Sequence, residues 1–297
     1  MKIFVYEHVT GGGLAGTPLP QSLAREGEAM LSGLARDLAG VRGVEIVTCR
    51  DSRFPPIEFP RVFEFERCLR EADAVWPIAP ETDSALEKIS RKILNRGKIL
   101  LGSEPETVHI AASKLETSRV LAEAGIAVAR TYHPEDRLPD SDTGWVVKPD
   151  DGAGCLDTLL FFSRAEAMRH AHISKHVMQP FVLGEPCSLS LLCRRGEARL
   201  LSCNHQRIEI NDGTVQFLGC DVACFSDETG VLSNLASRIG RALPGLWGYC
   251  GVDFVKTENG PVVIEINPRL TTSYGGLSDA LGKNVAAMVL DLCHLKP

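Results

Sequence analysis

The sequence lacks the long apolar segment that a membrane-spanning helix requires. No apolar run among its 297 residues approaches the roughly 20 residues needed to cross a bilayer. The first residues, MKIFVYEHV, are too short and too polar for a signal peptide, because Glu7 and His8 interrupt them. We therefore expect a soluble cytoplasmic protein without a membrane partner.

A basic run and a CxxC pair are also missing. The 38 acidic and 32 basic residues leave a net charge of −6, so nucleic acid is not an expected partner. The ten cysteines are scattered and form no zinc-binding or redox spacing, which predicts reduced structural thiols. Cys193, Cys203 and Cys250 lie within apolar strand patterns, where cysteine behaves as a small buried apolar residue.

The N-terminal third alternates predicted strands and helices. A length of 297 residues favours two domains, and a hydrophobic content of 44% supports a sizeable core. The alternation predicts a parallel sheet with crossover helices over residues 1–105. The expected strands are Lys2–Tyr6, Glu45–Thr48, Ala74–Ile78 and Lys98–Leu101, and the expected helices are Gln21–Ala39 and Thr82–Arg96.

Two loops follow predicted strands of this sheet, at the edge where parallel sheets bind ligands. They are Glu7–Gly13, with three consecutive glycines, and Ala79–Thr82. The glycines permit close backbone approach to a ligand, but they lack the dinucleotide spacing GxGxxG. A plain flexible turn remains open as the alternative.

Two lysines precede segments that suit phosphate binding. Lys114 opens an amphipathic helix after Ser113, and Lys148 ends the apolar strand Trp145–Pro149. The small-residue loop Asp150–Cys155 follows Lys148 at once and can line a concavity with backbone N–H groups. It is not a Walker loop, and a plain hairpin with a glycine turn is the competing interpretation. As a lone lysine, Lys114 would more often be a solvated surface residue.

An extended connector and a meander come next. Strand His176–Gln179 is interrupted by PFVLGEP before Cys187–Cys193 resumes it, and such a connector can present backbone groups to a planar base. The meander strands that we expect are Ala198–Cys203, Gln206–Ile210 and Thr214–Cys220, followed by a helix over Thr229–Ala242 and a closing helix over Lys283–Leu292.

The stretch GYCGVDFVKTENGPVVIEINPR organises the rest of the chain. Two apolar runs flank the polar turn Thr257–Gly260, which predicts a β-hairpin. Glu265 and Asn267 then share one face of the second strand, and Asp253 lies across from them on the first. Oxygen ligands of this kind suit a hard cation such as Mg²⁺. The alternative is that these are exposed positions of an ordinary hairpin.

These motifs, in this order over residues 110 to 270, resemble the ATP-grasp ligase superfamily. The resemblance implies an α/β and α+β protein with an N-terminal parallel α/β (pre-ATP-grasp) domain. The expected domains are 1–105 on the substrate side, 106–186 as the first ATP-grasp lobe with a glycine-rich lid, and 187–297 as the second lobe with the metal-binding hairpin. ATP and Mg²⁺, or Mn²⁺ in its place, are the implied cofactors.

The resemblance also implies a role for each matching residue. Lys114 and Lys148 would contact the α- and β-phosphates, and Arg269 would reach the transferred phosphoryl group, which makes Lys148 and Arg269 the catalytic candidates. Asp253, Glu265 and Asn267 would hold the metal. The lid over the γ-phosphate would be Asp151, Gly152, Ala153, Gly154 and Cys155. The adenine edge would meet Gln179, Pro180, Phe181 and Val182, with the amide of Phe181 or Val182 as donor, and the ribose would meet Glu185.

A narrower resemblance is carried by KIFVYEHVTGGG, GEPCSLSLL and EINPRLTTSYGGL, which look like the tyramine–glutamate ligases of methanofuran biosynthesis. The chain departs from that pattern at Asn204–Arg207, where Asn-His-Gln-Arg replaces Asn-Arg-Gln. The implied reaction joins a small-molecule carboxylate to an amine through an acyl phosphate. Another amino acid or peptide substrate, a carboxylase, a non-catalytic nucleotide-binding protein and a homodimer all remain open.

Three further roles are expected around this reaction. The Gly11–Gly13 loop and Arg269 would face the carboxylate substrate, and a second lid would be the loop Thr271–Gly276. The base for the amine is left open among Glu7, His8, His205 and Asp221, each of which could equally be a structural polar group.

Overall fold

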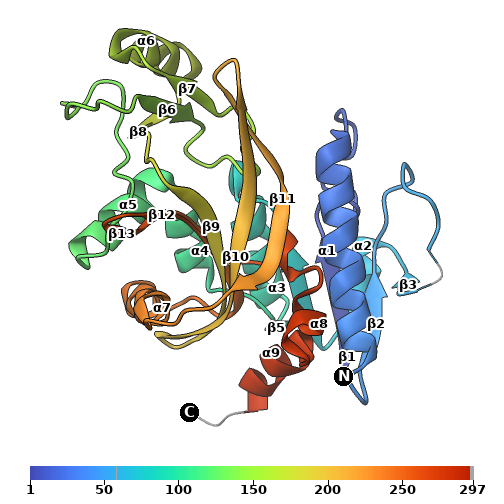
Figure 1. The fold of residues 1–297 in the computed structure, drawn as a ribbon. Helices are drawn as coiled ribbons and strands as arrows, with labels where there is room; N and C mark the ends of the chain where they lie inside the picture. Colours follow the sequence, from blue (N-terminus) through green and yellow to red (C-terminus); the bar gives the residue numbers. More distant parts are fainter. Residues whose placement is uncertain (58, 295–297) are drawn as a thin grey trace.

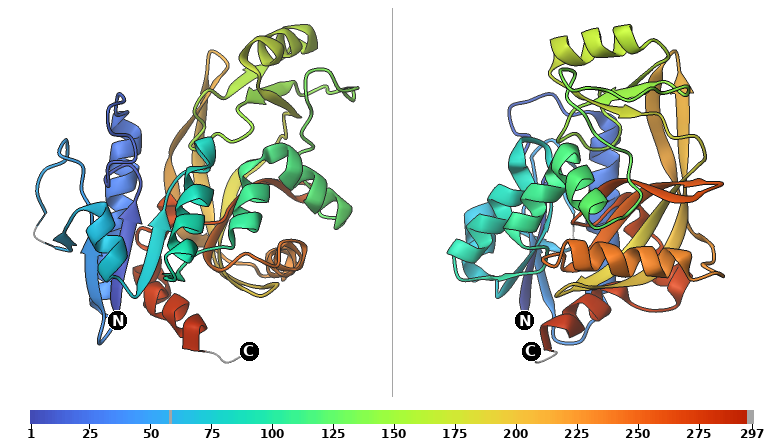
Figure 2. Two further views of the ribbon diagram at one scale, coloured as in Figure 1. Left: turned by 180° about the vertical axis from the view of Figure 1, so that it is seen from behind. Right: turned by 90° about the vertical axis from the view of Figure 1, so that its left-hand side faces the viewer.

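The structure, a computed structural model, describes residues 1–57 and 59–294. Two β-sheets lie side by side, a five-stranded one near the N-terminus and an eight-stranded one built from the rest of the chain (Figures 1 and 2). Helices cover both. Their bounds are α1 Gln21–Ala39, α2 Phe65–Glu71, α3 Ala85–Asn95, α4 Pro105–Ala112, α5 Lys114–Glu123, α6 Arg164–Ser174, α7 Val231–Ala242, α8 Leu277–Leu281 and α9 Val285–His294, with 3-10 turns η1 Thr82–Ser84 and η2 Thr272–Tyr274.

The first sheet has the order β3-β2-β1-β4-β5, and every neighbouring pair is parallel. Its strands are β1 Lys2–Glu7, β2 Glu45–Thr48, β3 Arg61–Val62, β4 Ala74–Ile78 and β5 Ile99–Leu100. Successive side chains of a strand point to opposite faces, so Ile3 and Val5 pack in the core that α1 shares, while Phe4 and Tyr6 pack with α2 and α3. The predicted parallel α/β unit is confirmed.

The second sheet is antiparallel, in the order β13-β12-β9-β10-β11-β7-β6-β8. The bounds are β6 Trp145–Lys148, β7 Leu159–Phe161, β8 Val177–Pro180, β9 Glu185–Arg194, β10 Glu197–Asn211, β11 Thr214–Phe225, β12 Gly248–Thr257 and β13 Gly260–Asn267. The predicted hairpin is β12–β13, in which Asp253 pairs with Glu265 and Thr257 with Gly260.

Separate helices cover the two ends of this sheet. α5 and α7 bury Leu121 and Ile239 in one core with Leu191 and Phe254 of the long strands. α6 packs over β6 and β8 at the far end of the sheet (Figure 1). The small β6–β8 lobe therefore has a core of its own, around Trp145.

α1 joins the two units. Tyr274 Oη donates to Asp37 Oδ2 at 2.7 Å, and Asn284 Nδ2 donates to the Asp37 carbonyl at 2.7 Å. Met30 and Leu34 on the same helix share a core with Val289 of α9. The C-terminal segment thus packs against the N-terminal unit, as the red and blue ribbons of Figure 1 show.

Several predicted elements differ from the observed ones. Ala198–Cys203 and Gln206–Ile210 are parts of one strand, β10, because irregularities near Cys203 and Arg207 are absorbed without breaking the pairing. The predicted helix Thr82–Arg96 starts as η1 and bends at Asp83 and Ser84, which have φ of 55° and 56°. The linker 103–112 contains α4, and α2 and α6 were not predicted.

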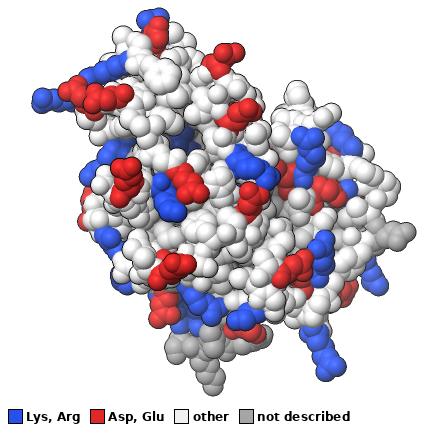
Figure 3. Space-filling view, in the orientation of Figure 1, with Lys and Arg blue, Asp and Glu red and all other residues white. Residues whose placement is uncertain are grey.

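The proposed division at residues 105/106 and 186/187 stays a prediction, and its last three residues lie outside the described part of the chain. No helix within residues 1–57 and 59–294 has the length and apolar character to cross a membrane. On the face seen in Figure 3, acidic and basic side chains are interspersed and form no broad basic patch.

Candidate functional site

A cavity of about 620 Å³ lies where the two units meet. Its lining comes from the carboxyl ends of β1 and β4, from α1, and from the concave side of the antiparallel sheet. The sequence-predicted residues in it are Lys114, Lys148, Gly152, Ala153, Gly154, Cys155, Gln179, Pro180, Phe181, Val182, Asp253, Glu265, Asn267 and Arg269. One cavity therefore collects nearly all candidates, although the role of each stays a prediction.

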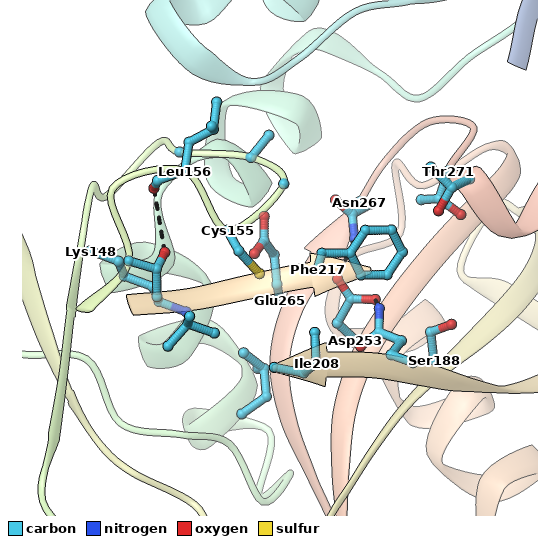
Figure 4. Close-up of a pocket in the computed structure, with 18 of the residues that line it drawn as sticks. Lys148, Cys155, Leu156, Ser188, Ile208, Phe217, Asp253, Glu265, Asn267 and Thr271 are labelled. Atoms are coloured by element: carbon cyan, nitrogen blue, oxygen red, sulfur yellow. Dashed lines mark hydrogen bonds between the residues drawn. The ribbon is translucent and has the colours of Figure 1, made fainter. Parts of the chain in front are cut away.

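The three predicted metal ligands lie together on the β12–β13 hairpin (Figure 4). Asp253 is paired with Glu265, and Asn267 Nδ2 donates to Asp253 Oδ2 at 3.1 Å. Burial, together with the neighbouring charge of Glu265, raises the pKa of Asp253 to about 7. Two partly buried carboxylates that repel each other form a site that a cation would stabilise.

Gln206 of β10 orients this group from the neighbouring part of the sheet. Its Nε2 donates to Asp253 Oδ1 at 2.9 Å, and it lines the cavity. Both carboxylate oxygens of Asp253 thus accept an amide N–H. Gln206 was expected only as the first residue of a meander strand and as part of the departure at Asn204–Arg207, and the signal that could have found it was its inward position on the meander.

The two lysines are buried beside the hairpin. Lys114 and Lys148 are 5% and 7% exposed. The alternative that Lys114 is a solvated surface residue is therefore wrong. Lys114 Nζ donates to the carbonyls of Gly152 at 2.7 Å and Asp150 at 3.1 Å, and it lies 3.7 Å from Glu265 Oε1. Burial, together with the nearby charge of Lys114, lowers the pKa of Lys148 to about 8.

The loop between β6 and β7 covers these groups. The two strands are antiparallel neighbours, so residues 149–158 form a hairpin with a long loop and not a tight turn. Gly154, Cys155 and Asp157 have φ of 66°, 58° and 51°. Figure 4 places Cys155 beside Glu265, and Thr158 Oγ1 donates to the Leu156 carbonyl at 3.4 Å. The loop lines the same cavity as the two lysines and Glu265, and its role as a lid stays a prediction.

Asp151, the first residue of the predicted lid, holds the loop to the N-terminal unit instead of lining the cavity. Its Oδ2 accepts the Asp83 amide at 2.9 Å, and its carbonyl accepts Thr82 Oγ1 at 3.0 Å. The neighbouring Asp150 Oδ1 accepts the Leu115 amide at 2.9 Å at the start of α5. The base of the loop is therefore anchored from two sides, and the glycine-rich part projects beyond it.

The connector after β8 offers one backbone position to a planar ligand. The Phe181 amide donates to the Gly144 carbonyl at 2.9 Å, and the Phe181 carbonyl accepts Thr143 Oγ1. Phe181 therefore cannot supply the amide that was expected from it or from Val182. In the part of the chain that the structure describes, Val182 makes no backbone hydrogen bond outside regular structure. Val182 is the remaining candidate.

Two other predicted contacts lie differently. Gln179 Nε2 donates to Thr131 Oγ1 at 2.8 Å and to the Ala129 carbonyl. Its side-chain amide is therefore engaged by the segment before β6. Glu185 does not line the cavity and lies within ion-pair distance of Lys256, at 3.4 Å, and of His205, at 3.7 Å. To contact a ribose, Glu185 would have to give up its ion pairs with Lys256 and His205.

Arg269 is held by a residue of the other unit. Its Nε and Nη2 donate to both carboxylate oxygens of Glu81, with the shortest distance 2.7 Å, and its Nη1 donates to the Leu270 carbonyl. The side chains of Arg269 and Glu81 are 11% and 3% exposed. Glu81 lies in the loop after β4 that was expected at the ligand edge, but its role as the partner of Arg269 was not predicted.

Buried hydroxyl groups form the wall next to Arg269. Tyr249 Oη lies 3.0 Å from both Ser190 Oγ and Thr271 Oγ1, and 2.9 Å from Ser273 Oγ. Ser273 and Tyr274 are buried. The first half of the predicted second lid, Thr271–Gly276, is therefore fixed in the core and does not have the freedom of a lid. Thr271 and Ser273 line the cavity.

The expected role of the Gly11–Gly13 loop is not supported by its packing. A Cβ at Gly11 would lie 2.5 Å from the Glu7 carbonyl, and one at Gly13 would lie 2.2 Å from the His8 ring. Gly11 and Gly13 are required for close contact with the chain itself, and neither lines the cavity that contains Lys114 and Lys148. Of the loop that follows β1, Val9 and Leu14 reach it.

Of the four base candidates, one lines the cavity. Glu7 does so, but its carboxylate accepts the amides of Val9 at 3.1 Å and Thr10 at 2.6 Å. His8 lies against Tyr6, with its Nδ1 3.2 Å from the hydroxyl. His205 lies beside Glu185, and Asp221 is paired with Arg207.

The donor set fits a hard divalent ion. Among the described residues no group of three or more His, Cys, Asp or Glu side chains gathers, so the hairpin offers two carboxylates and one amide oxygen. Mg²⁺ is usually held by one or two carboxylates and completes its shell with water and phosphate oxygens. The chemistry of the three side chains is therefore suitable for Mg²⁺ in the presence of a nucleotide.

Comparison with protein families assigns most of the chain. An ATP-grasp domain matches residues 111–273, and a pre ATP-grasp domain matches residues 44–108. A relative named tyramine–L-glutamate ligase, from Methanocaldococcus jannaschii, is 28% identical over 205 residues, which are 69% of this chain and 58% of the relative. This chain thus matches less than two thirds of that relative's length.

Solved structures agree with this assignment. A protein of Archaeoglobus fulgidus assigned to the ATP-grasp superfamily superimposes with a TM-score of 0.77 at 28% identity, over 98% of this chain and 88% of that one. D-alanine–D-alanine ligase of Bacillus anthracis, solved with ATP, gives 0.62 at 16% identity over 98% and 99%. The second likeness concerns the fold alone. The family match, the two-sheet architecture and the lysine and carboxylate cavity agree: the chain belongs to the ATP-grasp family.

Proposed function

We propose that this protein is an ATP-dependent carboxylate–amine ligase that forms an amide and releases ADP and phosphate. The observation that carries the proposal is the convergence in one cavity of Lys114 and Lys148, the carboxylates of the hairpin, and Arg269. A non-catalytic nucleotide-binding site would not need Arg269 in the same cavity as the two lysines and the paired carboxylates.

The proposed reaction has two steps. A carboxylate oxygen of the substrate attacks the γ-phosphorus of ATP, and the bond to the ADP oxygen breaks with its electron pair on ADP. The amine nitrogen then attacks the acyl carbon, the C–O bond to phosphate breaks, and the nitrogen loses a proton. Phosphorylation is needed because a carboxylate is a poor electrophile, and phosphoryl transfer depends mainly on charge neutralisation and alignment.

Each group of side chains has a place in this scheme. Lys114 and Lys148 neutralise the α- and β-phosphates, and Arg269 neutralises the transferred phosphoryl group. Asp253, Glu265 and Asn267 hold Mg²⁺, or Mn²⁺ with the same donors, which supplies positive charge to the phosphate oxygens when bound. Val182 offers its backbone amide to the adenine edge. Glu185 would take the ribose only after releasing Lys256 and His205.

Nucleotide binding would change how the lid segment Gly152–Cys155 is held. Lys114 Nζ donates to the carbonyl of Gly152 at 2.7 Å, a bond that a phosphate oxygen would replace. Release of that carbonyl frees the segment Gly152–Cys155 to close over the γ-phosphate. Closure keeps water from the acyl phosphate, which would otherwise hydrolyse.

L-glutamate and tyramine are the first substrates to test. The support is the name of the Methanocaldococcus relative, which shares 28% identity over 205 residues with this chain. With these substrates the protein would act in methanofuran-type cofactor biosynthesis. The ten free cysteines favour a reducing compartment, so we place the reaction in the cytoplasm.

The test is a substrate matrix with Mg-ATP. Purified protein is incubated with L-glutamate and other amino acids, each with and without tyramine, and ADP, phosphate and product mass are measured. We expect ADP and an amide of matching mass to form in equal amounts. Trapping with hydroxylamine should give a hydroxamate from the activated carboxylate. ATP binding without ADP formation for every carboxylate would overturn the proposal.

A further inference from the structure

Three carboxylates approach the cavity from the N-terminal unit, and two of them already have partners. Glu7 accepts the amides of Val9 and Thr10, and Glu81 accepts two bonds from Arg269. Glu26 of α1 lines the cavity, and within residues 1–57 and 59–294 it accepts no hydrogen bond and forms no ion pair. The half-buried Glu26 is therefore the carboxylate left available on this side.

Glu26 shares its helix face with apolar side chains. Leu23, Glu26, Gly27 and Met30 recur at the spacing that places residues on one face of a helix, and all four line the cavity. A Cβ at Gly27 would lie 2.6 Å from Glu7 Oε2, so the glycine allows α1 to approach the end of β1. Glu26 therefore lies between the apolar Leu23 and Met30 and lines the cavity, while the Glu7 carboxylate packs against Gly27.

The same cavity also has a cationic side chain and hydroxyl groups in its lining. They belong to Arg269, Thr271 and Ser273. Burial raises the pKa of Glu26, and the charges of Arg269 and Arg25 partly offset this rise. Glu26 and Arg269 line the same cavity, so a substrate bound there can meet both side chains. A second cation next to Glu26 would offset the remaining cost of burying its charge.

We propose that Glu26 binds the ammonium group of the amine substrate, while Leu23 and Met30 pack against its apolar body. The substrate class is then a primary amine with an extended apolar or aromatic portion, and a short hydrophilic amine would leave the apolar face uncovered. This assignment rests on the proposed ligase function, and the bound ammonium must give up a proton before its nitrogen can attack the acyl carbon in the same cavity.

The test compares wild type with Glu26→Gln at saturating Mg-ATP and L-glutamate and varied tyramine. We expect the KM for tyramine to rise at least tenfold in the variant, while the KM for ATP stays within twofold. Hydroxylamine is small and mainly uncharged at neutral pH, so hydroxamate formation should proceed at a similar rate in both proteins. Calorimetric titration of tyramine should show the same loss of binding without turnover.

Two further variants sharpen the result. Glu28→Gln is the matched control, because Glu28 is on the same helix, is paired with Arg50 at 3.0 Å and does not line the cavity. It should leave the KM for tyramine unchanged. Leu23→Ala should reduce the preference for tyramine over methylamine by about tenfold, since roughly 1–2 kcal/mol of apolar contact is lost. Circular dichroism and thermal melting establish that each variant is folded.

The outcomes separate the two proposals. A folded Glu26→Gln variant with a tyramine KM within twofold of wild type would overturn the amine assignment, as would an equal loss of hydroxamate formation. If wild type forms neither ADP nor hydroxamate with any carboxylate, the ligase function itself fails. Hydroxamate formation by wild type, with a selective loss of tyramine use in Glu26→Gln, would support both.

Discussion

Arg269 and Glu81, which are 188 residues apart in the chain, form a buried ion pair at 2.7 Å that connects the segment after the β12–β13 hairpin to the N-terminal unit. The guanidinium uses Nε and Nη2 for Glu81, which fixes its plane. Arg269 therefore reaches the cavity in a set orientation. Such a paired arrangement is rigid, and rigidity is what a group that neutralises a transferring phosphoryl requires.

Glu81→Gln should weaken both the fold and the reaction. Loss of one partner leaves the Arg269 charge buried without compensation, which should lower the free energy of unfolding by about 2–4 kcal/mol. The kcat should fall as well, because Arg269 loses its orientation. Urea unfolding followed by tryptophan fluorescence and steady-state kinetics measure the two effects.

The control is Glu116→Gln, at a surface pair with Arg119 in α5. This exposed pair should contribute little, so the variant should unfold like wild type. Equal unfolding curves for Glu81→Gln and wild type would contradict the structural role given to Glu81.

Glu265→Gln should abolish ADP formation while the fold stays intact. Glu265 is paired with Asp253 and lies near Lys114, so the substitution removes a negative metal ligand and also relieves the repulsion between two carboxylates. We expect kcat to fall by about 100-fold or more and the melting temperature to be equal or higher. Glu258→Gln, in the exposed turn of the same hairpin, is the control and should retain full activity. Full turnover by Glu265→Gln would count against the metal assignment.

The buried charge of Lys148 should make the stability of the ligand-free protein depend on pH. Its pKa in the folded protein is about 8, below the ordinary value of 10.5, so between these values the unfolded chain binds more protons. The free energy of unfolding contributed by this group therefore rises with pH across that window. Lys148→Met should remove this dependence and raise the melting temperature near pH 7, while nucleotide binding is lost.

The same lysine should link nucleotide binding to proton uptake. Above about pH 8 the free protein has a partly neutral Lys148, and phosphate oxygens restore its charge. ATP affinity should therefore fall as pH rises through 8, with protons taken up on binding. Calorimetry in buffers of different ionisation enthalpy measures the uptake, and a flat affinity from pH 7 to 9.5 would rule this linkage out.

Tyr249→Phe should loosen the hydroxyl wall of the cavity. The Tyr249 hydroxyl contacts Ser190, Thr271 and Ser273, and its removal leaves these buried groups with one partner fewer. We expect the free energy of unfolding to fall by about 1–3 kcal/mol and the KM for the carboxylate to rise. Tyr132→Phe is the comparison, because the Tyr132 ring packs on Trp145 and, among the described residues, its hydroxyl has no hydrogen bond. An unchanged carboxylate KM in Tyr249→Phe would exclude a role for this wall in substrate binding.

The sequence by itself determined the features that depend on short-range spacing. Asp253, Glu265 and Asn267 could be placed together because a β-hairpin has a fixed period and its turn could be recognised. The parallel N-terminal unit followed from alternating strand and helix patterns for the same reason. Lys148 could be assigned to the end of a strand next to a small-residue loop, although its burial could not.

The tertiary structure alone decided which groups are free to act. The Phe181 amide, the Asp151 carboxylate and the Glu7 carboxylate are all engaged by other parts of the chain. The contact of Arg269 with Glu81 and the exposure of Glu26 to the cavity depend on how the two sheets pack. This packing determines which hydrogen-bond partners meet from distant parts of the chain. Such partners cannot be predicted from the periodicity of a local sequence.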